Sequence, residues 1–250
     1  MSGHSKWAQI KRQKGVADAR RGQLFTKLTR EIMVAVREAG ANPESNFRLR
    51  LAIQKARDNN MPSENIERAI KRGSGELGAA ALSSLTAEGY GPNGVAIMVE
   101  ALTDNRNRTL QEIRSAFARH GGSLGESGCV AWLFETRGVI VVEVDGVQAE
   151  ELALLAIDAG ADDVKVEKGY LEIYTTPQNL ETVRRVVEQV KPPISAEVSR
   201  VAKSTVVLGE KEAIQTLKLL DHLEEMDDVQ RVFANLDYSD AVLEKLRVQA

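Results

Sequence analysis

The chain has 250 residues, 43% of them hydrophobic and 4% aromatic, with a formal net charge of −3; this length allows one large domain or two to three small ones with mostly aliphatic cores. Its single cysteine, Cys129, excludes an intramolecular disulfide and argues against a structural zinc site. No apolar run approaches the ~20 residues that span a bilayer, and the basic N-terminus lacks the apolar core of a secretory signal, so a soluble cytoplasmic protein is expected.

The small net charge hides a strongly basic N-terminus. Residues 1–30 hold eight Lys or Arg against one acid, a formal charge of +7. Residues 1–75 together carry +9, whereas residues 76–250 carry −12. This asymmetry is typical of a chain that contacts a polyanion through its basic end.

Residues 1–22 are predicted to form a basic arm. Gly3, Gly15 and Gly22 interrupt the segment and its apolar residues are sparse, which favours an arm over an amphipathic mitochondrial transit peptide. The cations of the arm can neutralise phosphates, and Trp7, which lies among them, can stack on an unpaired base. The arm is therefore predicted to bind nucleic acid, in preference to a solvated basic tail that binds nothing in particular.

Residues 23–75 are predicted to form a helical bundle. The spacing of apolar residues predicts one helix over 23–39, a second between Asn42-Pro43 and Asn59-Asn60, and a third from Pro62 to Gly73. The three helices are joined by short connections. The Gly, Ala and Ser content of residues 73–89 indicates a linker after them.

After Tyr90 the periodicity alternates between strands and helices. Strands are predicted at 95–102, 123–124, 129–134, 139–144, 163–166, 171–174, 199–207 and 229–234, and helices at 109–120, 150–159, 180–190 and 210–224. The order within residues 137–207 is βαββαβ, a complete ferredoxin-like unit, and the flanking pieces sum to a second one. We therefore predict an α+β multidomain fold in which residues 76–136 and 208–240 form an outer α+β domain and residues 137–207 form an inserted α+β domain.

No segment has the features of a catalytic or cofactor site. G-x-G-x-x-G matches begin at Gly73 and Gly89, but the first follows a helix and the second precedes a strand, the wrong contexts for dinucleotide binding. His4, His120 and His222 lie in different segments without ligands at metal-binding spacing. We expect a protein that is not an enzyme, with no metal, cofactor, membrane partner or small-molecule substrate.

The residues predicted to contact nucleic acid are mainly cations. The main set is Lys6, Trp7, Lys11, Arg12, Lys14, Arg20, Arg21, Lys27 and Arg30, and the secondary set is His4, Arg68, Lys71, Arg72, Arg106 and Arg108. The third helix is short, and its cations indicate contact with the phosphate backbone rather than base readout. For the polar segment 103–109, helix capping and contact with a polyanion are both open.

Motifs distributed along the whole chain resemble the YebC family. They include Gly3-His4-Ser5-Lys6-Trp7, Asp18-Ala19-Arg20-Arg21-Gly22, Phe25-Thr26-Lys27-Leu28, Asn59-Asn60-Met61-Pro62, Tyr90-Gly91-Pro92 and the run from Leu102 to Thr109. The resemblance implies a helical N-terminal domain and two α/β domains, one inserted in the other. It also implies a cytoplasmic, DNA-binding transcriptional regulator. A mitochondrial relative described as a translational activator, and bacterial relatives linked to the ribosome and proline-rich peptides, imply the alternative of a translation factor that contacts ribosomal RNA.

Overall fold

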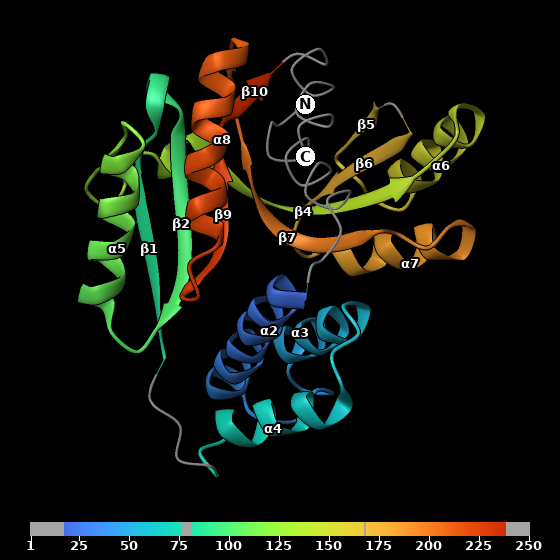
Figure 1. Ribbon diagram of the computed structural model, residues 1–250. Coiled ribbons are helices and arrows are strands. Elements are labelled where there is room, and N and C mark those ends of the chain that lie inside the picture. The colour runs from blue at the N-terminus through green and yellow to red at the C-terminus, as the bar shows by residue number, and fades with distance from the viewer. Residues whose placement is uncertain (1–17, 77–81, 168, 239–250) are drawn as a thin grey trace. The chain divides into compact units, whose positions relative to one another are not determined.

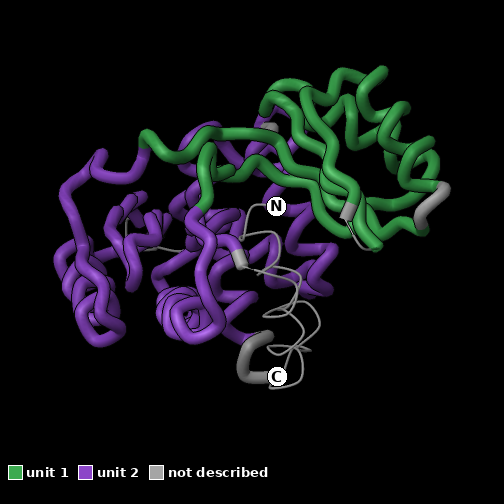
Figure 2. The backbone as a smooth tube through the Cα atoms, turned by 90° about the horizontal axis from the view of Figure 1, so that it is seen from above, with its two compact units in different colours: residues 1–2, 132–205 green, residues 3–131, 206–250 purple. Residues whose placement is uncertain are grey.

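The computed structural model describes residues 18–76, 82–167 and 169–238. Figure 1 labels its helices and strands, and Figure 2 shows the two compact units into which the chain divides. The described residues 132–205 form the smaller unit, which we call the inserted domain. The larger unit contains the helical bundle and a sheet domain that we call the outer domain, formed by chain segments on both sides of the insertion.

The predicted three-helix bundle is confirmed, but its first helix begins at Asp18 and not at residue 23, so residues 18–22 of the predicted arm are helical. Its helices are α2 (Asp18–Ala39), α3 (Phe47–Asp58) and α4 (Ser63–Gly73). The buried side chains are aliphatic and include Leu28, Ile32, Leu49, Ala56 and Ile66. Asn46 is buried at the α2–α3 connection, where its side chain accepts a hydrogen bond from the Leu49 N–H at 3.0 Å and donates to the carbonyls of Ala35 and Gly40 at 2.7 and 2.8 Å. This cap starts α3 and ties it to the end of α2.

The inserted domain has the predicted ferredoxin-like topology. Its elements are β4 (Phe134–Glu143), α6 (Gly146–Asp158), β5 (Asp163–Glu167), β6 (Tyr170–Thr175), α7 (Leu180–Val190) and β7 (Ser195–Ala202). The antiparallel sheet has the strand order β5-β6-β4-β7, and α6 and α7 cover one of its faces (Figure 1). Alternate strand residues such as Ile140, Val142, Leu171 and Ile173 form the core beneath the helices.

The outer domain is assembled from segments before and after the insertion. Its elements are β1 (Ser83–Tyr90), β2 (Ala96–Thr103), α5 (Arg106–Arg119), β3 (Ser123–Leu124), α8 (Glu210–Glu224) and β9 (Val229–Ala234). The strand order is β3-β1-β2-β9, and the short strands β8 (Val206–Leu208) and β10 (Leu236–Tyr238) pair in parallel beside it. The G-x-G-x-x-G match at Gly89 lies at the β1–β2 connection, which agrees with its interpretation as a loop.

The linker predicted over residues 73–89 is wrong for its second half, which is strand β1. Ser, Ala and Gly residues gave this segment the composition of a linker, yet β1 pairs with both β2 and β3 in the interior of the sheet. Its glycine is required by close packing, because a Cβ atom at Gly89 would lie 2.5 Å from the Ser123 carbonyl oxygen and 2.9 Å from the Phe117 ring. The outer domain therefore begins with a hairpin, an order of elements that the sequence prediction did not contain.

Two predicted strands also need correction. Residues 129–133 are turns and a 3₁₀ turn, and β4 begins only at Phe134. The predicted strand over 199–207 is two strands, because β7 pairs with β4 in the inserted domain whereas β8 pairs with β10 in the outer domain. Both errors lie where the chain passes from one unit to the other. They arise because an apolar run that crosses such a boundary has the pattern of a single continuous strand.

The turn at residues 128–131 is held by Glu88, a buried acid of β1. One carboxylate oxygen accepts the N–H of Gly128 at 2.8 Å, and the other accepts those of Val130 and Ala131 at 3.0 and 2.8 Å. Burial raises the pKa of Glu88, but these three hydrogen bonds outweigh burial and leave the pKa below its ordinary value. The carboxylate therefore supplies the acceptors that a neighbouring strand would otherwise provide.

Substitution of Glu88 with glutamine is expected to destabilise this turn, because an amide cannot accept all three N–H groups. The expected cost is about 1–3 kcal/mol in urea unfolding, with faster hydrogen exchange at residues 128–131. The exposed neighbour Glu126 provides a matched control, Glu126→Gln, that removes the same charge. Equal unfolding free energies for the two variants would contradict this role of Glu88.

Candidate nucleic-acid interface

Much of the predicted interface precedes the first described helix. His4, Lys6, Trp7, Lys11, Arg12 and Lys14 lie outside the described residues. Arg20 and Arg21 belong to the first turns of α2, and their side chains also lie outside the described part. The geometry that follows concerns Lys27, Arg30 and the secondary set.

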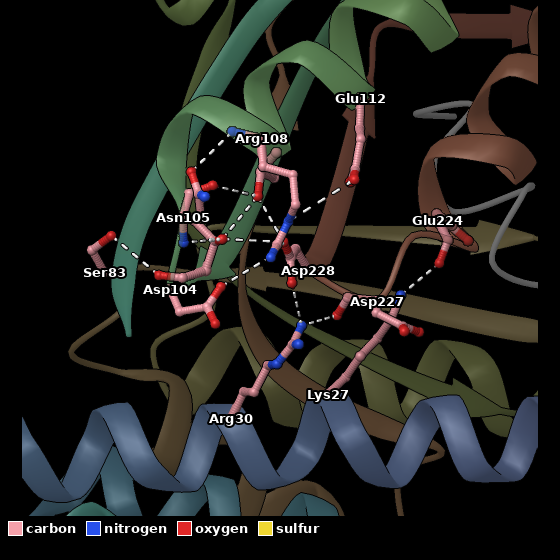
Figure 3. A network of polar contacts seen from close by, with 12 residues as sticks. Lys27, Arg30, Ser83, Asp104, Asn105, Arg108, Glu112, Glu224, Asp227 and Asp228 are labelled. Carbon is pink, nitrogen blue, oxygen red and sulfur yellow. Dashed lines mark hydrogen bonds and ion pairs between the residues drawn. The ribbon is translucent and has the colours of Figure 1, made fainter. Parts of the chain in front are cut away.

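Lys27 and Arg30 extend from one side of α2 toward the end of α8 (Figure 3). The Lys27 ammonium donates to the Glu224 carbonyl at 2.5 Å, and the Arg30 guanidinium donates to the Asp227 carbonyl. The last carbonyls of a helix have no partners within the helix and carry partial negative charge. The two cations of α2 therefore cap α8 and the turn that follows it.

Asp228 is the hub of the contacts around this turn (Figure 3). Arg30 contacts its Oδ1 at 2.9 Å. Its Oδ2 accepts hydrogen bonds from Arg108 at 2.8 Å, Thr109 at 2.6 Å and Thr103 at 3.1 Å. The aspartate side chain is only 7% exposed, so the carboxylate is buried with donors on both oxygens.

The environment of Asp228 favours its charged form. Burial alone would raise the pKa of Asp228, but hydrogen bonds from Thr109, Arg108 and Thr103 and the charge of Arg30 outweigh it and hold the pKa below the ordinary value. The same contact acts on the partner, because the hydrogen bond and charge of Asp228 raise the pKa of Arg108. The hub is thus an ionised carboxylate at neutral pH.

The polar segment 103–109 caps α5. The Asn105 side chain accepts the Arg108 N–H at 3.1 Å, and the Thr103 hydroxyl accepts the Asn105 N–H at 2.9 Å. Arg106 donates to the Ser84 carbonyl at 2.6 Å and is exposed. Helix capping, one of the two alternatives for this segment, is therefore present, and Arg108 lies against Asp228.

The secondary cations of α4 lie on an exposed face of the bundle. Arg68, Lys71 and Arg72 are exposed at helical spacing, opposite the buried face of Ile66 and Ala69. Within the described residues, none of these three cations forms an ion pair. They are available to a ligand, whereas Lys27, Arg30 and Arg108 already have protein partners.

Two further features, metal-binding clusters and membrane-spanning helices, were sought in the part of the chain that is described. Among those residues, no group of three His, Cys, Asp or Glu side chains is arranged to hold a metal ion. None of the described helices combines the length and apolarity that membrane crossing requires.

Comparison with protein families covers the bundle and both sheet domains. Residues 5–76 match the TACO1/YebC protein N-terminal domain, and residues 82–236 match the TACO1/YebC second and third domain. The chain belongs to the TACO1/YebC family. This confirms the resemblance inferred from the sequence motifs.

Relatives in the TACO1/YebC family match over nearly the full chain. A probable transcriptional regulatory protein of Dehalococcoides mccartyi is 57% identical over 251 residues, covering 100% of both chains. One from Natranaerobius thermophilus is 49% identical, covering 98% of this chain and 99% of the relative. A crystal structure of a conserved hypothetical protein from Aquifex aeolicus has 50% identity and a TM-score of 0.81, covering 89% of this chain and 92% of that one.

Sequence reasoning on this TACO1/YebC chain missed the Asp228 hub. In the sequence, the pair Asp227-Asp228 is typical of a turn, which accounts for its place after α8 but not for its partners. Arg108 lies 120 residues from Asp228 in the sequence, and Arg30 lies 197 residues from Asp227, whose carbonyl it contacts. The run from Thr103 to Thr109 was the available signal, because it places the hydroxyls of Thr103 and Thr109 and the guanidinium of Arg108 close together in the sequence. The run does not indicate which acid these groups bind.

Proposed function

We propose that this protein is a nucleic-acid-binding regulator of gene expression, acting in the cytoplasm as a DNA-binding transcriptional regulator. The observation that carries the proposal is the separation of charge, +9 over residues 1–75 and −12 over the rest. Release of counterions from a polyanion favours binding by the basic part, whereas repulsion between like charges disfavours contact by the acidic part. The names of the relatives, probable transcriptional regulatory proteins, support transcription as the process.

The mode of binding that we propose is contact with phosphates. The arm cations Lys6, Lys11, Arg12 and Lys14 supply most of the attraction. The exposed face of α4 with Arg68, Lys71 and Arg72 extends it along the bundle. Such contacts fix position and give affinity with little dependence on sequence.

A second candidate is a translation factor that contacts ribosomal RNA, and the charges of α4 favour it. In a helix-turn-helix the N-terminal residues of the second helix read base edges. Here the first turn of α4 carries Glu64, and two of its three cations, Lys71 and Arg72, lie in the last turn. An acid at that position repels phosphates, so α4 lacks the features of a base-reading helix, and Trp7 and His4 suit unpaired RNA bases.

One experiment separates the two candidates. Purified protein is titrated against duplex DNAs of unrelated sequence, and ribosomes are sedimented from lysate at low and moderate salt. The transcription proposal expects binding to duplex DNA at low salt that weakens as salt rises, and no sedimentation with ribosomes at moderate salt. Salt-resistant sedimentation with ribosomes, together with weak and sequence-blind duplex binding, would overturn it in favour of the translation factor.

A further inference from the structure

We propose that Lys27 and Arg30 belong to an electrostatic latch that holds α2 against the end of α8 and that nucleic acid opens by competition. The α2 latch consists of Lys27 and Arg30 together with the Glu224 and Asp227 carbonyls and the Asp228 carboxylate. In the latched state both cations are withheld from phosphate. This inference rests on the proposed function and adds to it a regulation of the same basic surface.

The latch joins two parts of the larger unit that have separate cores. The described apolar clusters of the bundle and of the outer domain share no residue. The contacts resolved between α2 and the α8–β9 turn are hydrogen bonds and ion pairs, including a weaker bond from Gln23 to the Glu225 carbonyl at 3.5 Å. Polar contacts of this kind are weakened by salt and are typical of parts that separate.

The charges of α2 also define its position against the outer domain. Glu31 follows Arg30 on α2 and lies 3.7 Å from Arg231 of β9 and 3.2 Å from Lys55 of α3. Neighbouring charges of opposite sign on α2 thus meet opposite charges on the outer domain. If α2 were displaced along the outer domain, Glu31 would lie near the acids of the turn. Repulsion between these like charges disfavours positions of α2 other than the observed one.

Opening the latch leaves Asp228 well satisfied. When Arg30 departs, the aspartate keeps the hydrogen bonds from Arg108, Thr103 and Thr109. Arg30, which is 21% exposed in the latched state, then meets a phosphate, whose oxygens match a guanidinium as well as a carboxylate does. A competing polyanion therefore replaces the contact between Arg30 and Asp228 with a contact between Arg30 and a phosphate. The buried Asp228 carboxylate is not left without partners.

A disulfide staple tests this inference without removing any cation. Gln23→Cys and Glu225→Cys are combined in a Cys129→Ser background, because the Gln23 side chain reaches the Glu225 carbonyl. Affinity for a 20-base-pair duplex DNA and for a single-stranded RNA of the same length is measured for the oxidised and the reduced protein at low salt. The two single-cysteine variants, under the same oxidising conditions, are the controls.

The latch predicts that the oxidised protein binds both probes at least tenfold more weakly than the reduced protein, and that reductant restores binding. Equal affinities of the two forms, in a protein that binds, overturn the latch and leave the proposed function intact. If the two cysteines do not pair directly, a bifunctional thiol reagent that reductant cleaves is used to join them, since the Gln23 side chain is longer than that of cysteine. Failure of this longer linker to join them overturns the latch as well, because α2 would then not lie against the α8 end. If neither the wild type nor any variant binds either probe, the proposed function fails and the latch inference fails with it.

Discussion

Substitution of Asp228 with alanine is expected to lower the free energy of unfolding of the larger unit by about 2–3 kcal/mol. The change removes the acceptor of two hydroxyls, on Thr103 and Thr109, that are themselves buried. It also leaves Arg30 and Arg108 without their shared carboxylate, a smaller loss because both cations reach solvent. Urea unfolding followed by circular dichroism measures the effect.

The matched control is Asp227→Ala. Asp227 is exposed, and its contact with Arg30 is made by the backbone carbonyl, which the substitution keeps. We expect this control to stay within about 0.5 kcal/mol of the wild type. If Asp227→Ala and Asp228→Ala lower the free energy of unfolding by the same amount, the Asp228 carboxylate does not stabilise the larger unit as proposed.

The contribution of Asp228 should also depend on pH in a definite direction. Its folded-state pKa is held below the ordinary value, so the stabilisation is complete above the unfolded-state pKa of about 3.9 and is lost as pH falls through the lower folded-state pKa. Between wild type and Asp228→Asn, the difference in unfolding free energy should therefore be constant from pH 6 to 8. Below about pH 4 it should shrink. A difference that grows on acidification would contradict an ionised hub.

Neutralising the arm is expected to have the largest effect on binding. Replacing Lys6, Lys11, Arg12 and Lys14 with glutamine should weaken affinity for nucleic acid by on the order of 10²–10³-fold near 0.1 M salt, because four phosphate contacts and their released counterions are lost. Stability should be unchanged. Fluorescence anisotropy with labelled duplex DNA and RNA measures the loss.

The control for this variant removes the same four charges elsewhere. Arg114, Arg119, Lys211 and Lys218 are exposed on α5 and α8 of the outer domain. Their replacement with glutamine should reduce affinity less than about tenfold, through the change in net charge alone. If the control weakens binding as much as the arm variant, the arm has no special role as a contact.

The fold was predictable wherever the pattern was local. α7, α8 and β9 begin and end at the predicted residues, because the two helices repeat apolar residues at helical spacing and β9 is a short, mostly apolar segment after a turn. β1 was missed because its Ser, Ala and Gly residues have low strand propensity. Its place in the sheet comes from pairing on both sides and from packing against Phe117.

The cations of the candidate site could be predicted from the sequence, but the residues with which they pair could not. The sequence locates Lys27, Arg30 and Arg108 among the cations, yet all three contact the α8–β9 turn. Those partners lie more than a hundred residues along the chain, beyond the reach of any local pattern. Arg68 and Lys71, by contrast, remain exposed as a helical pattern alone suggests.

The salt dependence of binding tests the central claim, that the basic N-terminal part is the contact with nucleic acid. The association constant for duplex DNA is measured from 50 to 300 mM salt for the wild type and for the arm variant. We predict a log–log slope of about −4 or steeper for the wild type, and a slope that is shallower by about 3–4 for the variant lacking four cations. Equal slopes for the two proteins, or wild-type binding that does not change with salt, would contradict the claim.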